Sequence, residues 1–239
     1  MNRSRTFVLA FLALLISASA SAETLTIAAP VSGSLAFARY IAGLHRRDPF
    51  TESGPLAVVI EASLPRLGKE SRLLAIRETN ESERTEYSVL ETEGDPMVTQ
   101  QVIAPYLSLQ KEIEGLPLSS VIITPANYKF RLMGKVGTEG DSSYLFRIVP
   151  RKKRAGLIRG ELWIDSATGI AVVQAGYLVK TSSAEIRRIE MVRDTKLQDG
   201  SPHSRITRLR VETRSAGLGY LTITEFPPAA ARAVASAGE

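Results

Sequence analysis

The strongest constraint on the fold is an alternation of apolar and polar side chains between Asn127 and Asp165. Apolar residues recur at every second position through two consecutive segments separated by a turn at 137–141. A period of two indicates β-strands with one buried face. The apolar positions are Tyr128, Phe130, Leu132 and Val136 in the first segment and Tyr144, Phe146 and Ile148 in the second. A basic turn and a third segment at 160–165 follow, so the region predicts a three-stranded meander.

The same alternation continues on both sides of this region. Before it, strands are expected at 56–64, 72–77 and 86–90, and the turn Gly94-Asp95-Pro96 is interpreted as leading into a strand at 98–103. After it, strands are expected at 171–179, 186–192, 206–213 and 221–223. Consecutive hairpins are typical of an up-and-down antiparallel sheet. The sequence therefore predicts a mainly β protein of about eleven strands, and a sheet of that size must close or curl strongly.

Two stretches interrupt the strands with helical spacing. Ser34 is the expected N-cap of an amphipathic N-terminal helix that Pro49 stops. Its expected buried face consists of Phe37, Ile41 and Leu44. A short central helix is expected from Pro105, ending at Gly115. The segment Leu118–Ile123 is apolar without alternation, and it would either plug the core or form a lid over a ligand cavity.

The two ends of the chain are expected to lie outside the folded domain. Residues 1–22 have the features of a cleaved secretory signal peptide, with two arginines, an apolar run from Phe7 to Ile16 and small residues at the end. The apolar run is about ten residues, whereas a spanning helix needs roughly 20. Residues 227–239 are Ala-rich and are expected to be disordered. We therefore expect one domain at 23–226 and a location outside the cytoplasm.

Composition excludes several classes of function. The formal charge is +5, and removal of residues 1–22 takes away two arginines and leaves +3. With acids and bases interleaved, so small an excess does not predict nucleic-acid binding. The chain has no cysteine, so neither disulfides nor thiolate chemistry are available.

The sequence gives little support to an enzyme. His45 and His203 are the only histidines, and each is interpreted as a solvated surface residue. No spacing of His, Cys or acidic residues suggests a metal site, and no glycine-rich loop suggests a phosphate or cofactor site. Acid pairs such as Glu91 and Glu93 are typical of solvated faces. We therefore expect no catalytic residues, metal or cofactor.

The order of elements resembles a known group of envelope proteins. A signal peptide, an amphipathic helix, a meander, a helical interruption and a second meander are similar to the LolA/LolB-type and RseB-type periplasmic proteins. The residues that carry the resemblance are Tyr128-Lys129-Phe130, the 144–150 strand with its basic turn, and Leu162-Trp163-Ile164-Asp165 before Thr168-Gly169. The resemblance implies an unclosed β-barrel with helices in its mouth, a periplasmic location, and carriage of lipoprotein acyl chains or sensing of hydrophobic ligands.

Two hypotheses follow for the interior. In the first, the protein carries a lipid or lipid-modified protein in a cavity lined by Phe130, Leu132, Tyr144, Phe146, Trp163 and Tyr177. In the second, the same residues pack solidly, and the protein is a structural or regulatory adaptor for an envelope protein partner. The basic turn Arg151, Lys152, Lys153 and Arg154 is either a solvated hairpin tip or a docking point for an anionic membrane or an acidic partner.

Trp163, the only tryptophan, has two possible orientations. Strict alternation with Leu162 and Ile164 would place the indole on the outer, partly exposed face. The strand at 170–179 is apolar on both sides, which suggests cover on both faces and favours a mostly buried indole. We adopt the buried orientation as the prediction.

Overall fold

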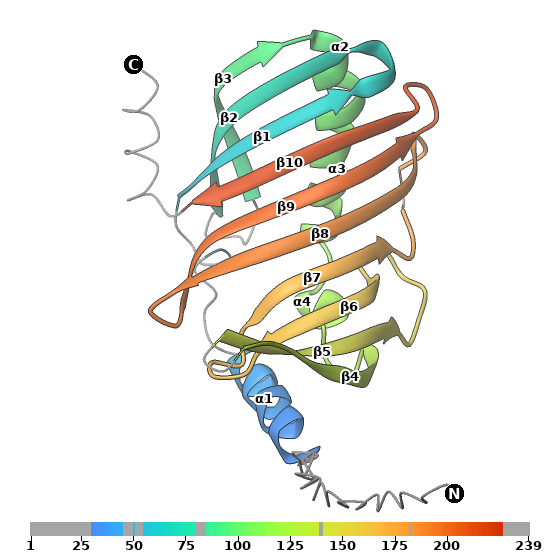
Figure 1. Cartoon of the computed structure of the whole chain (residues 1–239). Helices are drawn as coiled ribbons and strands as arrows, with labels where there is room; N and C mark the ends of the chain where they lie inside the picture. The colour runs from blue at the N-terminus through green and yellow to red at the C-terminus, as the bar shows by residue number, and fades with distance from the viewer. Residues whose placement is uncertain are drawn as a thin grey trace, which may run out of the picture.

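A single curled sheet forms the body of the protein (Figure 1). The computed structural model describes residues 30–44, 50, 55–79, 85–138, 141–181 and 183–226. Within these ranges the strands are β1 (Leu56–Leu64), β2 (Lys69–Thr79), β3 (Thr85–Gly94), β4 (Tyr128–Thr138), β5 (Asp141–Pro150), β6 (Ile158–Asp165), β7 (Ala171–Leu178), β8 (Ile186–Gln198), β9 (Ser201–Thr213) and β10 (Leu218–Phe226). Their order, β3-β2-β1-β10-β9-β8-β7-β6-β5-β4, leaves β3 and β4 as free edges. The expected mainly β, unclosed antiparallel meander is confirmed.

Helical segments lie on the concave side of the sheet (Figure 1). They are α1 (Pro30–Gly43), α2 (Pro96–Val98), the π-helical η2 (Thr99–Ile103), α3 (Ala104–Glu114) and α4 (Leu118–Val121); a 3-10 turn, η1 (Pro65–Leu67), joins β1 to β2. The chain leaves the sheet at edge strand β3, crosses through α2 to α4, and re-enters it at the opposite edge, β4. Val98, Val102 and Tyr106 on this crossing are buried, so the crossing helices fill one half of the concave face.

The described ranges contain ten strands instead of about eleven because 98–103 is helical. The Asp95 carboxylate accepts a hydrogen bond of 2.8 Å from the Met97 N–H, and Pro96 occupies the first turn. Aspartate as N-cap followed by proline starts a helix, so the prediction that the turn at 94–96 leads into a strand at 98–103 is wrong. Lys69 lies 2.9 Å from Asp95, and its hydrogen bond holds the pKa of that carboxyl below the ordinary value. The expected central helix from Pro105 is confirmed as α3.

Helix α1 begins earlier than expected. It starts at Pro30, so Ser34 lies inside the helix and the predicted N-cap is wrong. The predicted apolar face is confirmed, because Phe37, Ile41 and Leu44 pack partly buried against the core. Pro49, the signal peptide at 1–22 and the tail at 227–239 lie outside the described residues. No described helix is long and apolar enough to cross a membrane.

The strand register separates the two faces of the sheet. One cross-strand row on the concave face joins Ile60, Ile223 and Thr207, all buried. A row on the outer face joins Tyr220, Arg210, Glu190 and Tyr177 across β10, β9, β8 and β7. Gly160 and Gly176 face each other in β6 and β7, and a Cβ on Gly160 would lie 2.0 Å from the Ala175 carbonyl oxygen. The absence of side chains there lets the two backbones approach closely.

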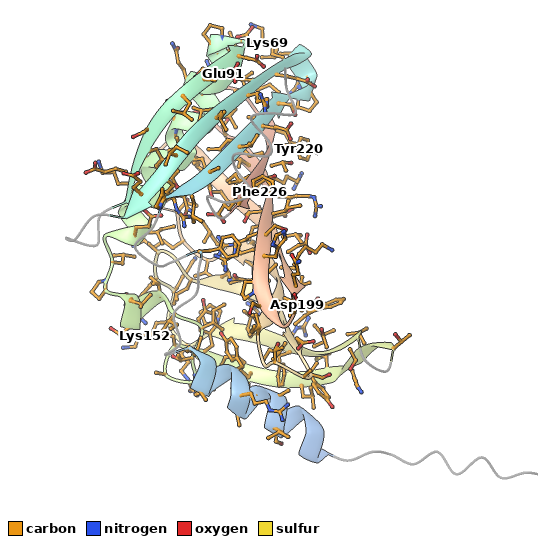
Figure 2. The ribbon with its side chains drawn as sticks, turned by 90° about the vertical axis from the view of Figure 1, so that its left-hand side faces the viewer. Lys69, Glu91, Lys152, Asp199, Tyr220 and Phe226 are labelled. Atoms are coloured by element: carbon orange, nitrogen blue, oxygen red, sulfur yellow. The ribbon has the colours of Figure 1, made fainter. Side chains whose placement is uncertain are left out.

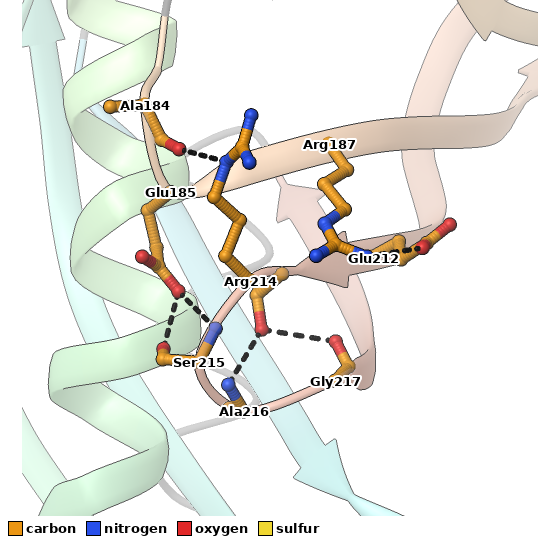
Figure 3. A network of polar contacts seen from close by, with 9 residues as sticks. Ala184, Glu185, Arg187, Glu212, Arg214, Ser215, Ala216 and Gly217 are labelled. Atoms are coloured by element: carbon orange, nitrogen blue, oxygen red, sulfur yellow. Dashed lines mark hydrogen bonds and ion pairs between the residues drawn. The ribbon is translucent and has the colours of Figure 1, made fainter.

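A polar network fixes the connection between β9 and β10 (Figure 3). The Glu185 carboxylate accepts hydrogen bonds from the N–H and hydroxyl of Ser215. Arg214 donates to the Ala184 carbonyl at 2.7 Å, and the Thr213 hydroxyl donates to the Gly217 carbonyl at 3.0 Å. The Ser215 hydrogen bonds lower the pKa of Glu185. These contacts give the network a structural role in closing the hairpin.

Candidate functional site

Helix α1 covers the β4–β6 end of the concave face and is anchored near its centre. Arg39 donates hydrogen bonds to the carbonyls of Ser166 and Ala167 at 3.2 and 2.9 Å. The turn that carries these carbonyls approaches α1 closely because it contains Gly169 at φ +76°, where a Cβ would lie 2.5 Å from that of Arg39. The Tyr40 hydroxyl donates to the Ile123 carbonyl at 2.9 Å. Arg39 and Tyr40 therefore tie the second half of the helix to two loops.

An aromatic cluster lies beneath the helix. The ring of Phe37 lies 4.8 Å from that of Phe130 and 5.4 Å from that of Phe146, measured between centroids. Tyr128 extends the cluster, with its ring 6.4 Å from Phe130. Burial of each such ring contributes about 1.5–3 kcal/mol, and tilted or edge-on pairs add about 0.5–1.5 kcal/mol. The aromatic cluster (Phe37, Phe130, Phe146 and Tyr128) thus provides an apolar site that α1 fills.

The aromatic cluster lies beside an open edge of the sheet. Edge strand β4 contributes Leu132, which pairs with Phe146 in the register and is 43% exposed. The first half of α1 passes directly over it, since a Cβ on Gly33 would lie 2.8 Å from Leu132 Cδ2. The exposed Leu132 therefore adjoins the aromatic cluster through its cross-strand partner Phe146, beneath the first half of α1.

The structure brings together four of the six residues that were predicted to line a cavity. Phe130, Leu132, Tyr144 and Phe146 share the concave face beneath α1. Trp163 and Tyr177 lie on the outer face, because Trp163 pairs with Leu145 and Val173, and Tyr177 pairs with Glu190. The indole of Trp163 is partly buried on the outer face, and its Nε1 atom is shielded and has no hydrogen-bond partner among the described residues. Every described residue of β7 is likewise half-buried, so neither face of that strand is fully covered.

The basic turn has two kinds of residue. Arg151 donates to the carbonyls of Pro125 and Tyr128 at 2.7 and 3.2 Å, and Arg154 donates to the side-chain oxygen of Asn127 at 2.9 Å. Asn127 is buried and donates to two carbonyls of the α4 segment, those of Ser119 and Ile122. The two arginines thus fix the chain entering β4, whereas Lys152 and Lys153 are simply exposed. The segment after α4 reaches the site through Ile123, while Leu118 is exposed.

Charged groups occupy the other half of the concave face. Arg77 on β2 forms an ion pair with Glu225 on β10 and donates to the Phe50 carbonyl, and both side chains are largely buried. The guanidinium of Arg205 lies 4.4 Å above the Phe50 ring. Burial raises the pKa of Tyr87 to about 12 and that of Tyr106 further still. Arg77 is thus a charged residue of β2 that lies inside the concave face, whereas Glu61, Arg72 and Glu93 of β1–β3 border a hollow on the outer face.

Two hollows lined by described residues open on the outer face. One, of about 440 Å³, is bordered by Tyr177, Val192, Arg208, Arg210 and Tyr220. The other, of about 450 Å³, is bordered by Glu61, Glu70, Arg72, Glu93 and the same Tyr220 (Figure 2). Ion pairs cross the first hollow: Arg210 lies 3.1 Å from Glu190, and its hydrogen bond lowers the pKa of that carboxyl. These hollows are shallow surface features and do not connect to the aromatic cluster.

Sequence reasoning missed part of the α1 site. Phe37 was placed on the correct helical face, but nothing in the alternation indicated that it would meet Phe130 and Phe146. The small residue Gly33, four positions before Phe37, was the available signal for close approach of the helix to a strand. Among the described residues, no three His or acidic side chains come together as metal ligands would, and His203 is exposed on β9.

Two solved structures are similar in fold. One is a LolA superfamily protein from Nitrosomonas europaea, with 13% identity, 80% of this chain and 90% of that chain covered, and a TM-score of 0.34. The other is MucB in complex with MucA(peri), with 12% identity, 81% and 93% covered, and a TM-score of 0.22. The sequence analysis expected a resemblance to LolA-type and RseB-type proteins, and a LolA superfamily protein is among the similar structures; nothing about ligands or partners of this chain follows from it. The sequence matches no protein-family model and no curated protein.

Proposed function

We propose that the protein is a non-catalytic periplasmic carrier that binds an acyl chain of a lipid or lipid-modified protein beneath α1. The observation that carries the proposal is the aromatic cluster at an open sheet edge, adjoined by the exposed Leu132 and covered by a helix that Arg39 and Tyr40 hydrogen-bond to neighbouring loops. The ring of Phe37 packs against both Phe130 and Phe146, which also contact each other. An acyl chain would replace it when the first half of α1 lifts.

The sole tryptophan provides a built-in control for testing this proposal. Trp163 lies on the outer face, so an acyl chain beneath α1 leaves its emission unchanged. In a Phe37→Trp, Trp163→Phe variant the new indole sits at the site and its emission should shift when a palmitoylated peptide is added. The same peptide without the acyl chain should have no effect on either protein. Absence of any shift in the variant, together with no retained acyl mass in native mass spectrometry, would contradict the carrier function.

A second candidate, an adaptor for an envelope protein, is favoured by the outer hollow between Tyr177 and Tyr220. Its apolar floor includes Val192, which is exposed, beside arginines that could meet acidic groups of a partner. An adaptor would bind no acylated peptide. Its cross-links to an envelope partner would disappear in a Tyr177→Ser, Tyr220→Ser variant, whereas a carrier would retain acyl binding in that variant.

A further inference from the structure

Exposed apolar side chains gather at the α1–β4 end of the molecule. Leu35 on α1 is 52% exposed, and on β4 Leu132, Met133 and Val136 are also exposed. Figure 1 shows α1 beside β4 and β5, at the end of the sheet farthest from β3. These side chains come from two elements, and they adjoin the path by which an acyl chain would enter. We call Leu35, Leu132, Met133 and Val136 the α1–β4 patch.

An irregularity in β4 brings two of these side chains to the edge. The register with β5 shifts between Leu132 and Gly134, so Met133 is an extra residue in β4. A bulge of this kind bends an edge strand and re-aims its side chains. As a result, Leu132 projects from the concave face and Met133 is exposed beside it. Exposed apolar side chains therefore lie on both faces of β4.

The charges on β4 are all positive. Lys129, Arg131 and Lys135 are exposed, and the strand contains no acidic residue. Arg131 is paired in the register with Arg147 on β5, which adds a fourth positive charge and is itself paired with Glu161 on β6. Across these three strands there are five bases and three acids, and the edge strand β4 itself carries three bases and no acid. This excess favours an anionic partner at the edge.

The opposite edge of the same sheet provides an internal contrast. Strand β3 also exposes apolar side chains, Val89 and Leu90, but its charged residues are Glu86, Glu91 and Glu93. Figure 2 shows Glu91 at the end of the molecule away from α1. Both edges expose apolar side chains, but their charges are opposite in sign, so an anionic surface would attract the β4 edge and repel the β3 edge. The sheet thus has a positively charged edge at β4 and a negatively charged edge at β3.

We infer that the α1–β4 patch docks on an anionic lipid bilayer, with Lys129, Arg131 and Lys135 facing the headgroups and the apolar side chains entering the interface. This inference rests on the proposed function, because docking would bring the mouth of the acyl site to the source or destination of the acyl chain. A bilayer fits better than an acidic peptide because the exposed apolar groups lie on both faces of β4 and on α1. A peptide strand would need a row of pockets on one face, and the two outer hollows lie over other strands.

Vesicle sedimentation at low salt tests the inference. Residues 23–239 are mixed with vesicles of phosphatidylcholine alone and, separately, with vesicles of phosphatidylcholine and phosphatidylglycerol in equal parts. The wild type should bind the anionic vesicles and lose binding as salt rises. A Lys129→Gln, Arg131→Gln, Lys135→Gln variant should bind about fivefold more weakly for each charge removed, on the order of a hundredfold in total. A Met133→Ser, Val136→Thr variant should also bind more weakly, without a change in the salt dependence.

Two matched controls separate this patch from other surfaces. A Lys152→Gln, Lys153→Gln variant removes exposed charge from the basic turn, and a Val89→Thr, Leu90→Ser variant removes apolar groups from the β3 edge. Both variants should bind vesicles as the wild type does.

Two results would overturn the inference: the Lys152 and Lys153 variant loses as much vesicle binding as the β4 charge variant, or the wild type shows no preference for anionic vesicles. So would binding of a soluble peptide of alternating Glu and Leu in the absence of vesicle binding. Unchanged emission shifts with the palmitoylated peptide in the β4 charge variant would show that the carrier function stands independently.

Discussion

At the scale of single residues, the buried polar groups decide which substitutions matter. Tyr128 is almost fully buried, and its hydroxyl oxygen accepts a hydrogen bond of 3.1 Å from the Ile158 N–H. Burial of the phenol raises its pKa to about 12, against the opposing effect of that hydrogen bond. The neutral form is therefore favoured in the folded protein. The raised phenol pKa of Tyr128 therefore affects the free energy of unfolding as follows. The stabilisation is fully present below about pH 10, where an unfolded tyrosine is still protonated, and it is lost as pH rises toward 12.

Tyr128→Phe should lower the free energy of unfolding at neutral pH by about 1–3 kcal/mol, because the Ile158 N–H stays buried without an acceptor. The variant should also lose less stability than the wild type between about pH 8 and pH 11, since one raised phenol pKa has been removed. Urea unfolding at the two pH values measures both effects. Tyr220→Phe, at an exposed position, is the control, with an expected change within about 0.5 kcal/mol. Equal stability of Tyr128→Phe and wild type at both pH values would contradict this account.

Prediction from sequence succeeded unevenly at this scale. The alternation correctly placed Phe130, Tyr144 and Phe146 on one face, because the period of two is a local property of each strand. Trp163 lies on the outer face, as strict alternation with Leu162 and Ile164 implies, and every residue of the neighbouring strand β7 is partly buried. The contacts of Arg151 and Arg154 join segments more than twenty residues apart and leave no local signal in a run of four bases.

At the scale of elements, a few residues determine where a helix or turn begins. Asp95 and Pro96 start the crossing helices, and this start was not separable from a β-turn without knowing that β3 is an edge strand with no further partner. The hairpins on both sides were predictable because short turns force neighbours in sequence to pair. The pairing of β1 with β10 was not, since it joins the first and last strands of the described chain, which are far apart in sequence.

The closest approach of two strands depends on Gly160 and Gly176. Gly160→Ala would place a Cβ 2.0 Å from the Ala175 carbonyl oxygen and 2.6 Å from Gly176 Cα, and neither backbone atom can move away alone. We expect a loss of roughly 1–3 kcal/mol or more in the free energy of unfolding, as for other overpacked sites. Gly134→Ala in edge strand β4 is the matched control, because nothing lies within 4 Å of the added Cβ, and it should change stability by about 0.5 kcal/mol at most. Similar denaturation midpoints for the two variants would show that β6 and β7 separate easily.

At the scale of the whole molecule, the open sheet creates two different halves of the concave face and two different edges. The crossing helices and the Arg77–Glu225 pair fill the half beneath β1, β2 and β10. Helix α1 covers the aromatic cluster beneath the β4 edge. Arg39 and Tyr40 hydrogen-bond its second half to the loops at Ser166–Ala167 and Ile123. The proposed carrier function requires the first half of α1 to move away from β4.

The most direct test of this central claim is a reversible cross-link between α1 and β4. The chain has no cysteine, and a Cβ on Gly33 would lie 2.8 Å from Leu132 Cδ2, so a Gly33→Cys, Leu132→Cys variant places two thiols at the mouth of the site. Binding of a palmitoylated peptide is measured on the same protein before and after reduction, with each single-cysteine variant as control. We predict that the oxidised protein does not bind the acyl chain and that reduction restores binding. Equal binding by the oxidised and reduced forms would contradict the claim that α1 must lift to admit an acyl chain.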